Sequence, residues 1–264
     1  MFTEAEKNGI VYMRSSVIPA FHAFSTRIGG VSTGEFSTLN FGSARGDDPD
    51  AVRENYRRWC ALFGVEEDGC CVTKQVHGNE VRTVSFSDRH HPMSPTPYEA
   101  DGIVTGEKGL PIFCFTADCV PVLLWDENGT AAGAVHCGWK SSVADILKNV
   151  LDAMGALGAE NRNIRAAIGP SIGRCCFETD RDVPDAIDRY LSGDTAGLWE
   201  TRGEKFYVDL RAANARRLIQ LGVMPEKIDI SEECTVCQSD RYWSARYTAR
   251  HALKRGSLCA GIVL

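Results

Sequence analysis

The chain lacks the features that would place it in a membrane or on nucleic acid. No apolar run approaches the roughly 20 residues that a membrane-spanning helix needs. Lysine and arginine number 29 against 35 aspartate and glutamate, for a net charge of −6, and they form no basic stripe that could neutralise phosphates along DNA or RNA. We therefore expect neither a membrane nor a nucleic acid as a partner.

An apolar secretory segment is also missing, since the first residues read Met-Phe-Thr-Glu-Ala-Glu-Lys. A chain of 264 residues needs no disulfides, because it can bury roughly 70 to 75% of its unfolded surface in its own core. The 11 cysteines are therefore consistent with a reduced, cytoplasmic setting. We expect one domain over residues 1–264.

Most of the cysteines show no metal-binding spacing. Residues 234–237 (Cys-Thr-Val-Cys) form the sole Cys-x-x-Cys motif, and no second pair completes a zinc ribbon. The adjacent pairs Cys70–Cys71 and Cys175–Cys176 do not have the spacing of ligand pairs either. We expect no metal or redox role for the 234–237 motif.

Three residues far apart in the chain have the chemistry of a zinc site. His77, Cys119 and His136 each lie at or near the end of an apolar, strand-like run. Two imidazoles and one thiolate suit zinc, and three protein ligands leave a fourth position open, as in catalytic zinc sites. The spacing alone is a weak signal, because a buried cysteine is more often a small hydrophobe and a single histidine a satisfied polar residue.

The apolar pattern predicts alternating strands and helices. Strands are expected at residues 71–76, 80–86, 101–105, 110–115, 120–125, 131–135, 164–168, 227–230 and 257–264, and a short strand from His22 runs into a turn at Gly29–Gly30. Helices are expected at 50–63, from about 142 to 154, at 183–191 and at 210–221. The turn glycines permit positive φ and close approach to a ligand, and Pro92, Pro95 and Pro97 predict a loop.

Polar residues interrupt the apolar pattern at two places. Asp118 lies between two buried runs, where an unpaired carboxylate is costly, so we expect it to have a functional partner. Ser142 and Asp145 resemble a capping box at the start of a helix that directly follows His136. That helix N-terminus and Lys140 are a candidate seat for phosphate or carboxylate, although an ordinary capped helix with a solvated lysine explains the pattern equally well.

A series of segments occurs in the order typical of one family. They are residues 27–32 (Arg-Ile-Gly-Gly-Val-Ser), 46–49 (Gly-Asp-Asp-Pro), 75–78 (Gln-Val-His-Gly), 100–105 (Ala-Asp-Gly-Ile-Val-Thr), 116–124 (Thr-Ala-Asp-Cys-Val-Pro-Val-Leu-Leu), 136–140 (His-Cys-Gly-Trp-Lys) and 168–172 (Ile-Gly-Pro-Ser-Ile). The pattern continues through 209–214 (Asp-Leu-Arg-Ala-Ala-Asn) and 234–237. Over nearly its whole length the chain resembles the YfiH family, formerly labelled multicopper polyphenol oxidase or laccase-like and now described as zinc-dependent purine nucleoside phosphorylase.

The resemblance implies an α/β domain with central mixed sheets flanked by helices, related in architecture to a group of cysteine hydrolases. It implies that His77, Cys119 and His136 are zinc ligands. The implied reactions are phosphorolysis of adenosine, inosine, guanosine and methylthioadenosine, with adenosine deamination as a further activity. The implied partners are therefore a small purine nucleoside and phosphate.

The chain departs from the family pattern at several cationic positions. Lys140 and Ser141 replace the usual Arg-Gly after His-x-Gly-Trp, and Tyr56 replaces an arginine after Glu54-Asn55. Near the C-terminus, Ser-His/Tyr-Arg-Arg-Asp and a later Thr-Gly-Arg become residues 244–248 (Ser-Ala-Arg-Tyr-Thr) and 255–257 (Arg-Gly-Ser). At residue 140 a point charge thus replaces a planar bidentate group.

Roles in catalysis can be assigned as hypotheses. We expect Arg27, Lys140 and Arg246 near phosphate. Asp118 or Asp101 could orient a ligand or shuttle a proton beside Cys119 and His136, and Asp118, next to Cys119, is the better candidate.

The same residues would also suit other reactions. Two histidines and a cysteine are the ligand set of blue copper, which would make the protein a copper-dependent polyphenol oxidase. Only six histidines are present, however, and His22, His90, His91 and His251 form no His-x-His pair for a further copper cluster. The pattern also fits a Cys-His hydrolase with Cys119 as nucleophile, or a non-catalytic binding protein with a structural metal.

Overall fold

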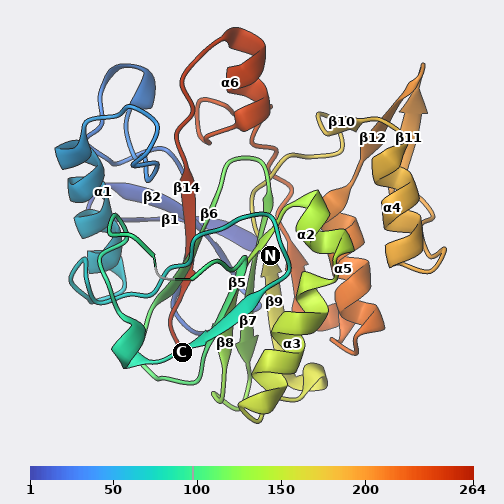
Figure 1. Cartoon of the computed structure of the whole chain (residues 1–264), viewed down its shortest axis with the longest axis horizontal. Coiled ribbons are helices and arrows are strands. Elements are labelled where there is room, and N and C mark those ends of the chain that lie inside the picture. Colours follow the sequence, from blue (N-terminus) through green and yellow to red (C-terminus); the bar gives the residue numbers. More distant parts are fainter. Residues whose placement is uncertain (97) are drawn as a thin grey trace.

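The computed structural model describes residues 1–96 and 98–264 (Figure 1). Two large sheets lie at its centre, with α1 on one side and α3 and α5 on the other. The expected α/β class with mixed sheets and flanking helices is therefore confirmed, and one domain over 1–264 stays a prediction. The loop around Pro92 and Pro95 is also confirmed, whereas Pro97 lies outside the described residues.

The first sheet has five strands and is antiparallel throughout. Its order is β1 (Phe2–Lys7), β2 (Ile10–Ser15), β3 (His22–Ser25), β14 (Leu258–Ile262) and β6 (Ile112–Thr116). Neither β1 nor β2 was predicted from the sequence. β1 has only partly buried and exposed residues and gives no apolar run, whereas β2 carries the short apolar run of residues 10–13, which was overlooked. The two ends of the chain thus meet in one sheet.

The second sheet has six strands and mixed direction. Its order is β13 (Ile228–Ile230), β9 (Ile164–Ile168), β7 (Val120–Asp126), β8 (Ala132–Cys137), β5 (Gly102–Thr105) and β4 (Val81–Val84). The outer pairs β13–β9 and β4–β5 are parallel and the inner pairs are antiparallel. A smaller antiparallel sheet consists of β10 (Glu178–Thr179), β12 (Lys205–Val208) and β11 (Trp199–Arg202).

Six α-helices complete the described part of the chain: α1 (Pro49–Leu62), α2 (Trp139–Val143), α3 (Ile146–Ala156), α4 (Asp182–Tyr190), α5 (Leu210–Gln220) and α6 (Ala245–His251). Short 3-10 turns lie at Gly34–Phe36, Phe86–Asp88, Asn161–Asn163 and Pro225–Lys227. Within residues 1–96 and 98–264, every helix is too short or too polar to cross a bilayer.

Alternation along the central strands produces the layers. Neighbouring residues of a strand point to opposite faces, so Leu123 of β7 packs between the two large sheets while Val122 packs under α3 and α5. In β6, Cys114 faces the space between the sheets and Phe113 faces α1. Because the central strands β6, β7, β8 and β14 are covered on both faces, they read as nearly continuous apolar runs.

Two sequence predictions of elements were wrong in detail. Residues 71–76 make only isolated bridges, Cys71 to Ile112 and Lys74 to Glu99, instead of a strand. The helix expected from about residue 142 is divided into α2 and α3, because Asp145 adopts the left-handed conformation with φ of 64°. Ser142 makes no cap, and the Asp145 carboxylate accepts hydrogen bonds from Arg217 at 2.9 and 2.5 Å instead.

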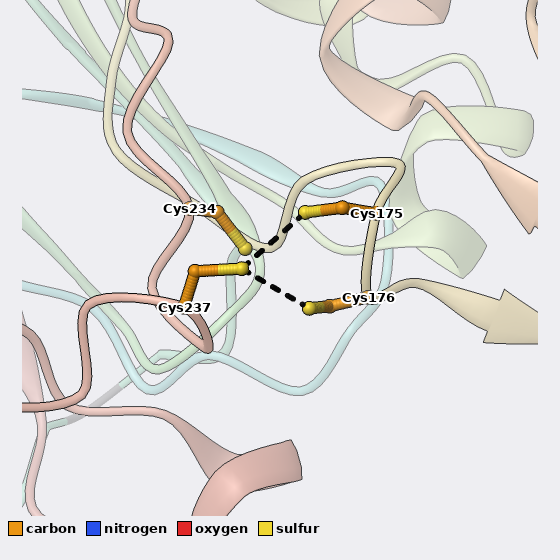
Figure 2. A group of neighbouring side chains, drawn as sticks. All are labelled: Cys175, Cys176, Cys234 and Cys237. Carbon is orange, nitrogen blue, oxygen red and sulfur yellow. Dashed lines mark hydrogen bonds between the residues drawn. The ribbon is translucent and has the colours of Figure 1, made fainter.

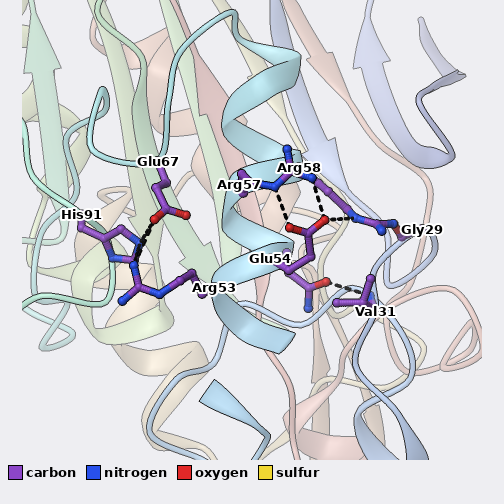
Figure 3. A network of polar contacts seen from close by, with 9 residues as sticks. Gly29, Val31, Arg53, Glu54, Arg57, Arg58, Glu67 and His91 are labelled. Carbon is purple, nitrogen blue, oxygen red and sulfur yellow. Dashed lines mark hydrogen bonds and ion pairs between the residues drawn. The ribbon is translucent and has the colours of Figure 1, made fainter. Parts of the chain in front are cut away.

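The first family motif, residues 27–32, makes contacts that stabilise the fold. Figure 3 shows α1 beside the loop that carries it: Val31 donates to Asn55 Oδ1 (2.9 Å), and Arg58 donates to Gly29 O (3.2 Å). A Cβ added at Gly29 would lie 2.2 Å from Gly9 O, and one at Gly30 would lie 2.2 Å from Thr38 O. The expected close approach therefore occurs, but toward neighbouring backbone and not toward a ligand.

Candidate metal centre and substrate cavity

Strand register brings two of the three predicted ligands together. In the antiparallel pair of β7 and β8, Val120 lies opposite Cys137 and Pro121 opposite His136. Cys119, one residue before β7, is therefore placed next to Gly138, one residue after β8. This proximity follows from pairing of two buried apolar strands, so residues 17 positions apart in the chain share one edge of the sheet.

The third candidate ligand, His77, lies in the loop before β4 and is held there by a buried carboxylate. Asp101 accepts hydrogen bonds from the backbone N–H groups of Val76 (3.1 Å), His77 (3.0 Å) and Gly78 (2.7 Å). His77 has φ of 61°, an uncommon conformation for a residue with a side chain, and successive N–H groups converging on one anion form a nest.

The same Asp101 carboxylate also orients His136. Its Oδ1 lies 2.7 Å from His136 Nδ1, and the backbone N–H of His136 donates to Asp101 O at 2.8 Å. A carboxylate on one ring nitrogen fixes the imidazole and leaves the other nitrogen for a metal. Sequence reasoning favoured Asp118 over Asp101 for this contact, and the structure places Asp101 there instead.

The three donor atoms converge. His77 Nε2 lies 3.9 Å from Cys119 Sγ, the two histidine rings have centroids 4.7 Å apart, and one donor atom from each residue lies within 4.8 Å of the others. A Cβ at Gly138 would lie 3.1 Å from His77 Cδ2 and 3.4 Å from Cys119 Sγ, so only glycine leaves this space free. The group has the geometry of a site that could hold a metal ion.

Electrostatics of the trio favour the ligand form of the thiol. Burial raises the pKa of Cys119, but hydrogen bonds with His136 and His77 outweigh it and bring this pKa to about 6. Burial lowers the pKa of His136, while the hydrogen bonds with Asp101 and Cys119 raise it to about 9. Around neutral pH the metal-free site therefore holds a thiolate, which is the form that binds metals.

The trio opens into a cavity of about 540 Å³, a size typical of small-molecule sites. Three aromatic side chains, Phe115, Trp139 and Phe177, line it. The other lining residues are Arg45, Thr73, Gln75, His77, Thr116, Ala117, Asp118, Cys119, His136, Ile172, Leu210, Ala245, Arg246, Ala249, Arg255 and Ser257. The cavity is thus amphipathic, since aromatic and aliphatic side chains line it together with a few charged groups.

The cations of the cavity differ from those expected. Arg246 lines it, whereas Arg27 lies on Trp243 (3.7 Å from guanidinium carbon to ring centroid) and donates to the carbonyls of Ser37 and Ser239. Lys140 is exposed over Trp139 and is not among the lining residues. Arg27 is therefore outside the lining of this cavity, and its place near phosphate stays a prediction.

Sequence reasoning missed two arginines. Arg45 and Arg255 both line the cavity, and the pKa of Arg45 is lowered by partial burial and by the nearby charge of Arg255. No local pattern marks either residue as a binding group. Their neighbours gave the only signal, since Arg45 precedes the 46–49 motif and Arg255 begins the altered 255–257 segment.

Asp118 has the partners that its buried position requires. Its Oδ1 accepts a hydrogen bond from Thr235 Oγ1 (2.6 Å) and its Oδ2 from the backbone N–H of Arg246 (2.6 Å). It adopts φ of 87°, which turns the chain sharply between β6 and β7, directly before Cys119. Asp118 therefore joins the candidate ligand Cys119 to the start of α6, which carries Arg246.

Comparison with known proteins agrees with this architecture. A family model described as multi-copper polyphenol oxidoreductase laccase matches residues 21–264. A purine nucleoside phosphorylase of Mycobacterium tuberculosis is 37% identical over 213 residues, covering 80% of this chain and 81% of the relative. The purine nucleoside phosphorylase YlmD of Geobacillus stearothermophilus is 33% identical over 235 residues, covering 86% and 85%.

Solved structures share the fold over nearly the full length. The crystal structure of YlmD from Geobacillus stearothermophilus has a TM-score of 0.90 at 29% identity and covers 98% of this chain and 97% of its own. The Bacillus licheniformis hypothetical protein YfiH has a TM-score of 0.88 at 25% identity, with the same coverage. The chain therefore belongs to the YfiH family, whose matching model carries the laccase description.

Proposed function

We propose that this protein is a zinc-dependent purine nucleoside phosphorylase. It cleaves the N-glycosidic bond of adenosine, inosine, guanosine or methylthioadenosine with phosphate. The observation that carries the proposal is that one cavity contains the His77, Cys119 and His136 donors, three aromatic walls and three arginines. Relatives named purine nucleoside phosphorylase, one of them 37% identical to this chain, support the same activity.

The residues fit zinc by their donor chemistry. Two imidazole nitrogens and a thiolate suit this ion, and the carboxylate of Asp101 on His136 Nδ1 is the outer partner that metal-bound histidines have. When bound, zinc would supply a Lewis acid that withdraws electron density from the purine or polarises a substrate oxygen. Side chains of the cavity would bind and orient the nucleoside and phosphate.

We assign the aromatic side chains to the purine and the arginines to phosphate. Phe115, Trp139 and Phe177 offer ring faces on which a base can stack. Arg45, Arg246 and Arg255 supply positive charge, and guanidinium groups match phosphate oxygens bidentately. Phosphate held there attacks C1′ of the ribose, the bond from C1′ to the purine nitrogen breaks, and its electron pair leaves with the purine, which takes up a proton.

Asp118 acts in this scheme by positioning. Its carboxylate holds the backbone of Arg246, while the Arg246 guanidinium donates to the carbonyls of Cys176 (3.3 Å) and Glu178 (3.1 Å). Both ends of Arg246 are therefore fixed at the cavity wall. A preorganised cation loses little conformational freedom when phosphate binds.

Adenosine deamination is a second activity of the proposal. Water would attack purine C6 and ammonia would leave, so this reaction needs no phosphate. The two activities thus separate by their dependence on phosphate and on the arginines.

A specific observation favours one other function, a Cys-His hydrolase. Cys119 Sγ lies 3.9 Å from His77 Nε2 and its pKa is lowered to about 6, as in an activated nucleophile. A multicopper oxidase is disfavoured because, among the described residues, the groups of donors that could hold a metal are this trio and one cysteine cluster. Neither supplies the further histidines that an additional copper cluster requires.

Product analysis tests the proposal. The purified protein is incubated with adenosine, with and without phosphate, and adenine, inosine and ribose 1-phosphate are measured. We expect adenine and ribose 1-phosphate to form only when phosphate is present. Inosine formed by deamination should appear both with and without phosphate. Adenine with free ribose, formed equally without phosphate, would overturn phosphorolysis and support hydrolysis.

The matched variants are Cys119→Ser and Cys71→Ala, since Cys71 is a buried thiol outside both donor groups. We expect Cys119→Ser to lose both reactions, because it removes the only anionic ligand of the trio. Cys71→Ala should keep them. Full phosphorolysis by Cys119→Ser would rule out the proposed site.

A further inference from the structure

A second group of potential metal ligands lies outside the cavity. Cys175, Cys176, Cys234 and Cys237 have Sγ atoms that all lie within 4.8 Å of one another. Cys237 Sγ is 3.6 Å from Cys175 Sγ and 3.5 Å from Cys176 Sγ. In Figure 2 the two pairs come from opposite sides and their sulfur atoms point toward one another.

The fold explains how these distant cysteines meet. β9 and β13 are parallel neighbours, with Ile168 opposite Ile230, so the segments that leave them run side by side. This pairing continues at Ser171, which bridges to Cys234. The chain then turns at Gly173, whose carbonyl accepts from the N–H of Cys176, and this turn folds Cys175–Cys176 back toward residues 234–237.

The sequence pattern predicted no metal at residues 234–237 because no second Cys-x-x-Cys pair is present. The second pair exists in space, and it consists of adjacent residues that have no ligand-like spacing of their own. Two short segments that lie 58 residues apart in the chain, from Cys176 to Cys234, therefore supply four thiols to one point.

The spacing of the sulfurs suits one ion. Zinc–sulfur bonds of about 2.3 Å in a tetrahedron put sulfur atoms roughly 3.8 Å apart, close to the distances found here. A disulfide would require about 2.05 Å between two sulfurs, and all four cysteines are free thiols. An iron–sulfur cluster would hold its four thiolates apart by the width of the cluster, which this compact group does not allow.

The surroundings already resemble those of bound thiolates. Cys234 Sγ accepts a hydrogen bond from the backbone N–H of Gly173 at 3.2 Å, and such bonds stabilise a metal-bound thiolate. The buried Arg211 donates to the carbonyls of Ser231 and Glu233, which fixes the segment before Cys234. The hydrogen bond from Gly173 and the contacts of Arg211 therefore fix the positions of the cysteines.

We propose that Cys175, Cys176, Cys234 and Cys237 form a second, tetrathiolate zinc site that braces the loop after β9 against the segment after β13. The four protein ligands leave no open position, so this site is structural. The brace bears on the cavity, because Thr235 between two of the ligands holds Asp118, and the carbonyl of Cys176 holds Arg246. The proposal does not depend on the reaction at the first site.

Zinc content tests the proposal. The protein is purified with reductant and without added metal, passed over a chelating resin, and analysed for zinc per chain. We expect two in the wild type, one in the double variant His77→Ala/Cys119→Ser, and one in the double variant Cys175→Ser/Cys237→Ser. The control Cys71→Ala should keep two.

A second measurement leaves the cluster intact, so it holds even if the serine variants unfold. The His77→Ala/Cys119→Ser protein is loaded with cobalt(II), and its thiolate-to-cobalt absorption is compared with that of the wild type. We expect most of the band to remain, since four of the five proposed thiolate ligands are unchanged. The proposal would be overturned if the His77→Ala/Cys119→Ser protein bound neither zinc nor cobalt. It would also be overturned if the four cysteines formed a disulfide or carried an iron chromophore.

Discussion

At the scale of single residues, Asp101 connects the two candidate histidine ligands. Its carboxylate takes three backbone N–H groups around His77 and also the ring of His136. Burial raises the pKa of Asp101, but the hydrogen bonds from His136 and from the backbone of Gly78 and Val76 outweigh burial and lower this pKa below its ordinary value, so the group stays charged. Removing the charge while keeping the shape should therefore weaken the metal site.

We predict that Asp101→Asn lowers zinc affinity at the trio by roughly 10- to 100-fold, the effect of losing an outer partner of a metal-bound histidine. A competition titration with a zinc indicator measures it. Asp88→Asn is the control, because Asp88 accepts from Ser85 and Arg82, which lie outside both donor groups. Unchanged zinc affinity in a folded Asp101→Asn protein would show that this carboxylate has no part in binding.

Arg255, which lines the cavity, and Arg27, which does not, should respond differently to substitution. Arg255→Gln should raise the KM for phosphate roughly tenfold or more, the loss expected when a hydrogen bond between charged groups is removed. Arg27→Gln should leave this KM unchanged and instead lower the free energy of unfolding by roughly 1–3 kcal/mol, because it removes the stack on Trp243 and two bonds to carbonyls.

Initial rates over a range of phosphate concentrations, with urea unfolding of the same proteins, check both statements. A raised phosphate KM in Arg27→Gln with normal stability would return Arg27 to the phosphate site.

The contrast between these arginines and the trio shows which parts of the site could be predicted from the sequence. Donor chemistry and the family resemblance pointed to His77, Cys119 and His136. The partners of an arginine could not be predicted in this way, because they depend on which distant segments fold beside it.

At the scale of elements, the register of β7 and β8 explains why sequence patterns found the site. Both strands are buried on two faces and therefore read as strong apolar runs, and their ends carry Cys119 and His136. Elements without such runs were missed. In the hairpin of β11 and β12, β11 has no fully buried residue, and the break between α2 and α3 depends on one left-handed residue, Asp145.

The strand β3 provides a test of pH-dependent stability. His22 is fully buried, accepts a hydrogen bond from Ser15 N at 2.9 Å, and has a pKa lowered from 6.5 to about 4, chiefly by burial. The unfolded chain thus binds a proton at a pH where the folded chain does not. This contribution to stability is fully present above pH 6.5 and is lost as the pH falls through about 4.

We predict that the wild type loses about 3 kcal/mol more unfolding free energy than His22→Gln does when the pH falls from about 7 to about 4. Urea unfolding at a series of pH values measures the difference, and carboxylates that titrate in both proteins cancel in it. Equal losses in the two proteins would mean that His22 is protonated in the folded state.

At the scale of the whole molecule, two sheets packed face to face carry the cavity at the ends of their strands. Cavity residues come from the loop before β4, the turn between β6 and β7, the end of β8 and the helix α6. Sequence patterns predicted most of these strands one by one. They did not predict that residues 175–176 and 234–237 meet, because that contact depends on the parallel pairing of β9 with β13.

The central claim is that His77, Cys119 and His136 hold the zinc that phosphorolysis needs. The most direct test measures ribose 1-phosphate formed from inosine and phosphate, together with zinc per chain, in the wild type, His77→Ala and His91→Ala. His91 is the control because it lies with Arg53 and Glu67, apart from both donor groups. The account predicts that His77→Ala loses one zinc per chain and that its rate of ribose 1-phosphate formation falls at least roughly 100-fold. His91→Ala should keep the wild-type zinc content and the wild-type rate. A His77→Ala protein that forms ribose 1-phosphate at the wild-type rate would contradict it.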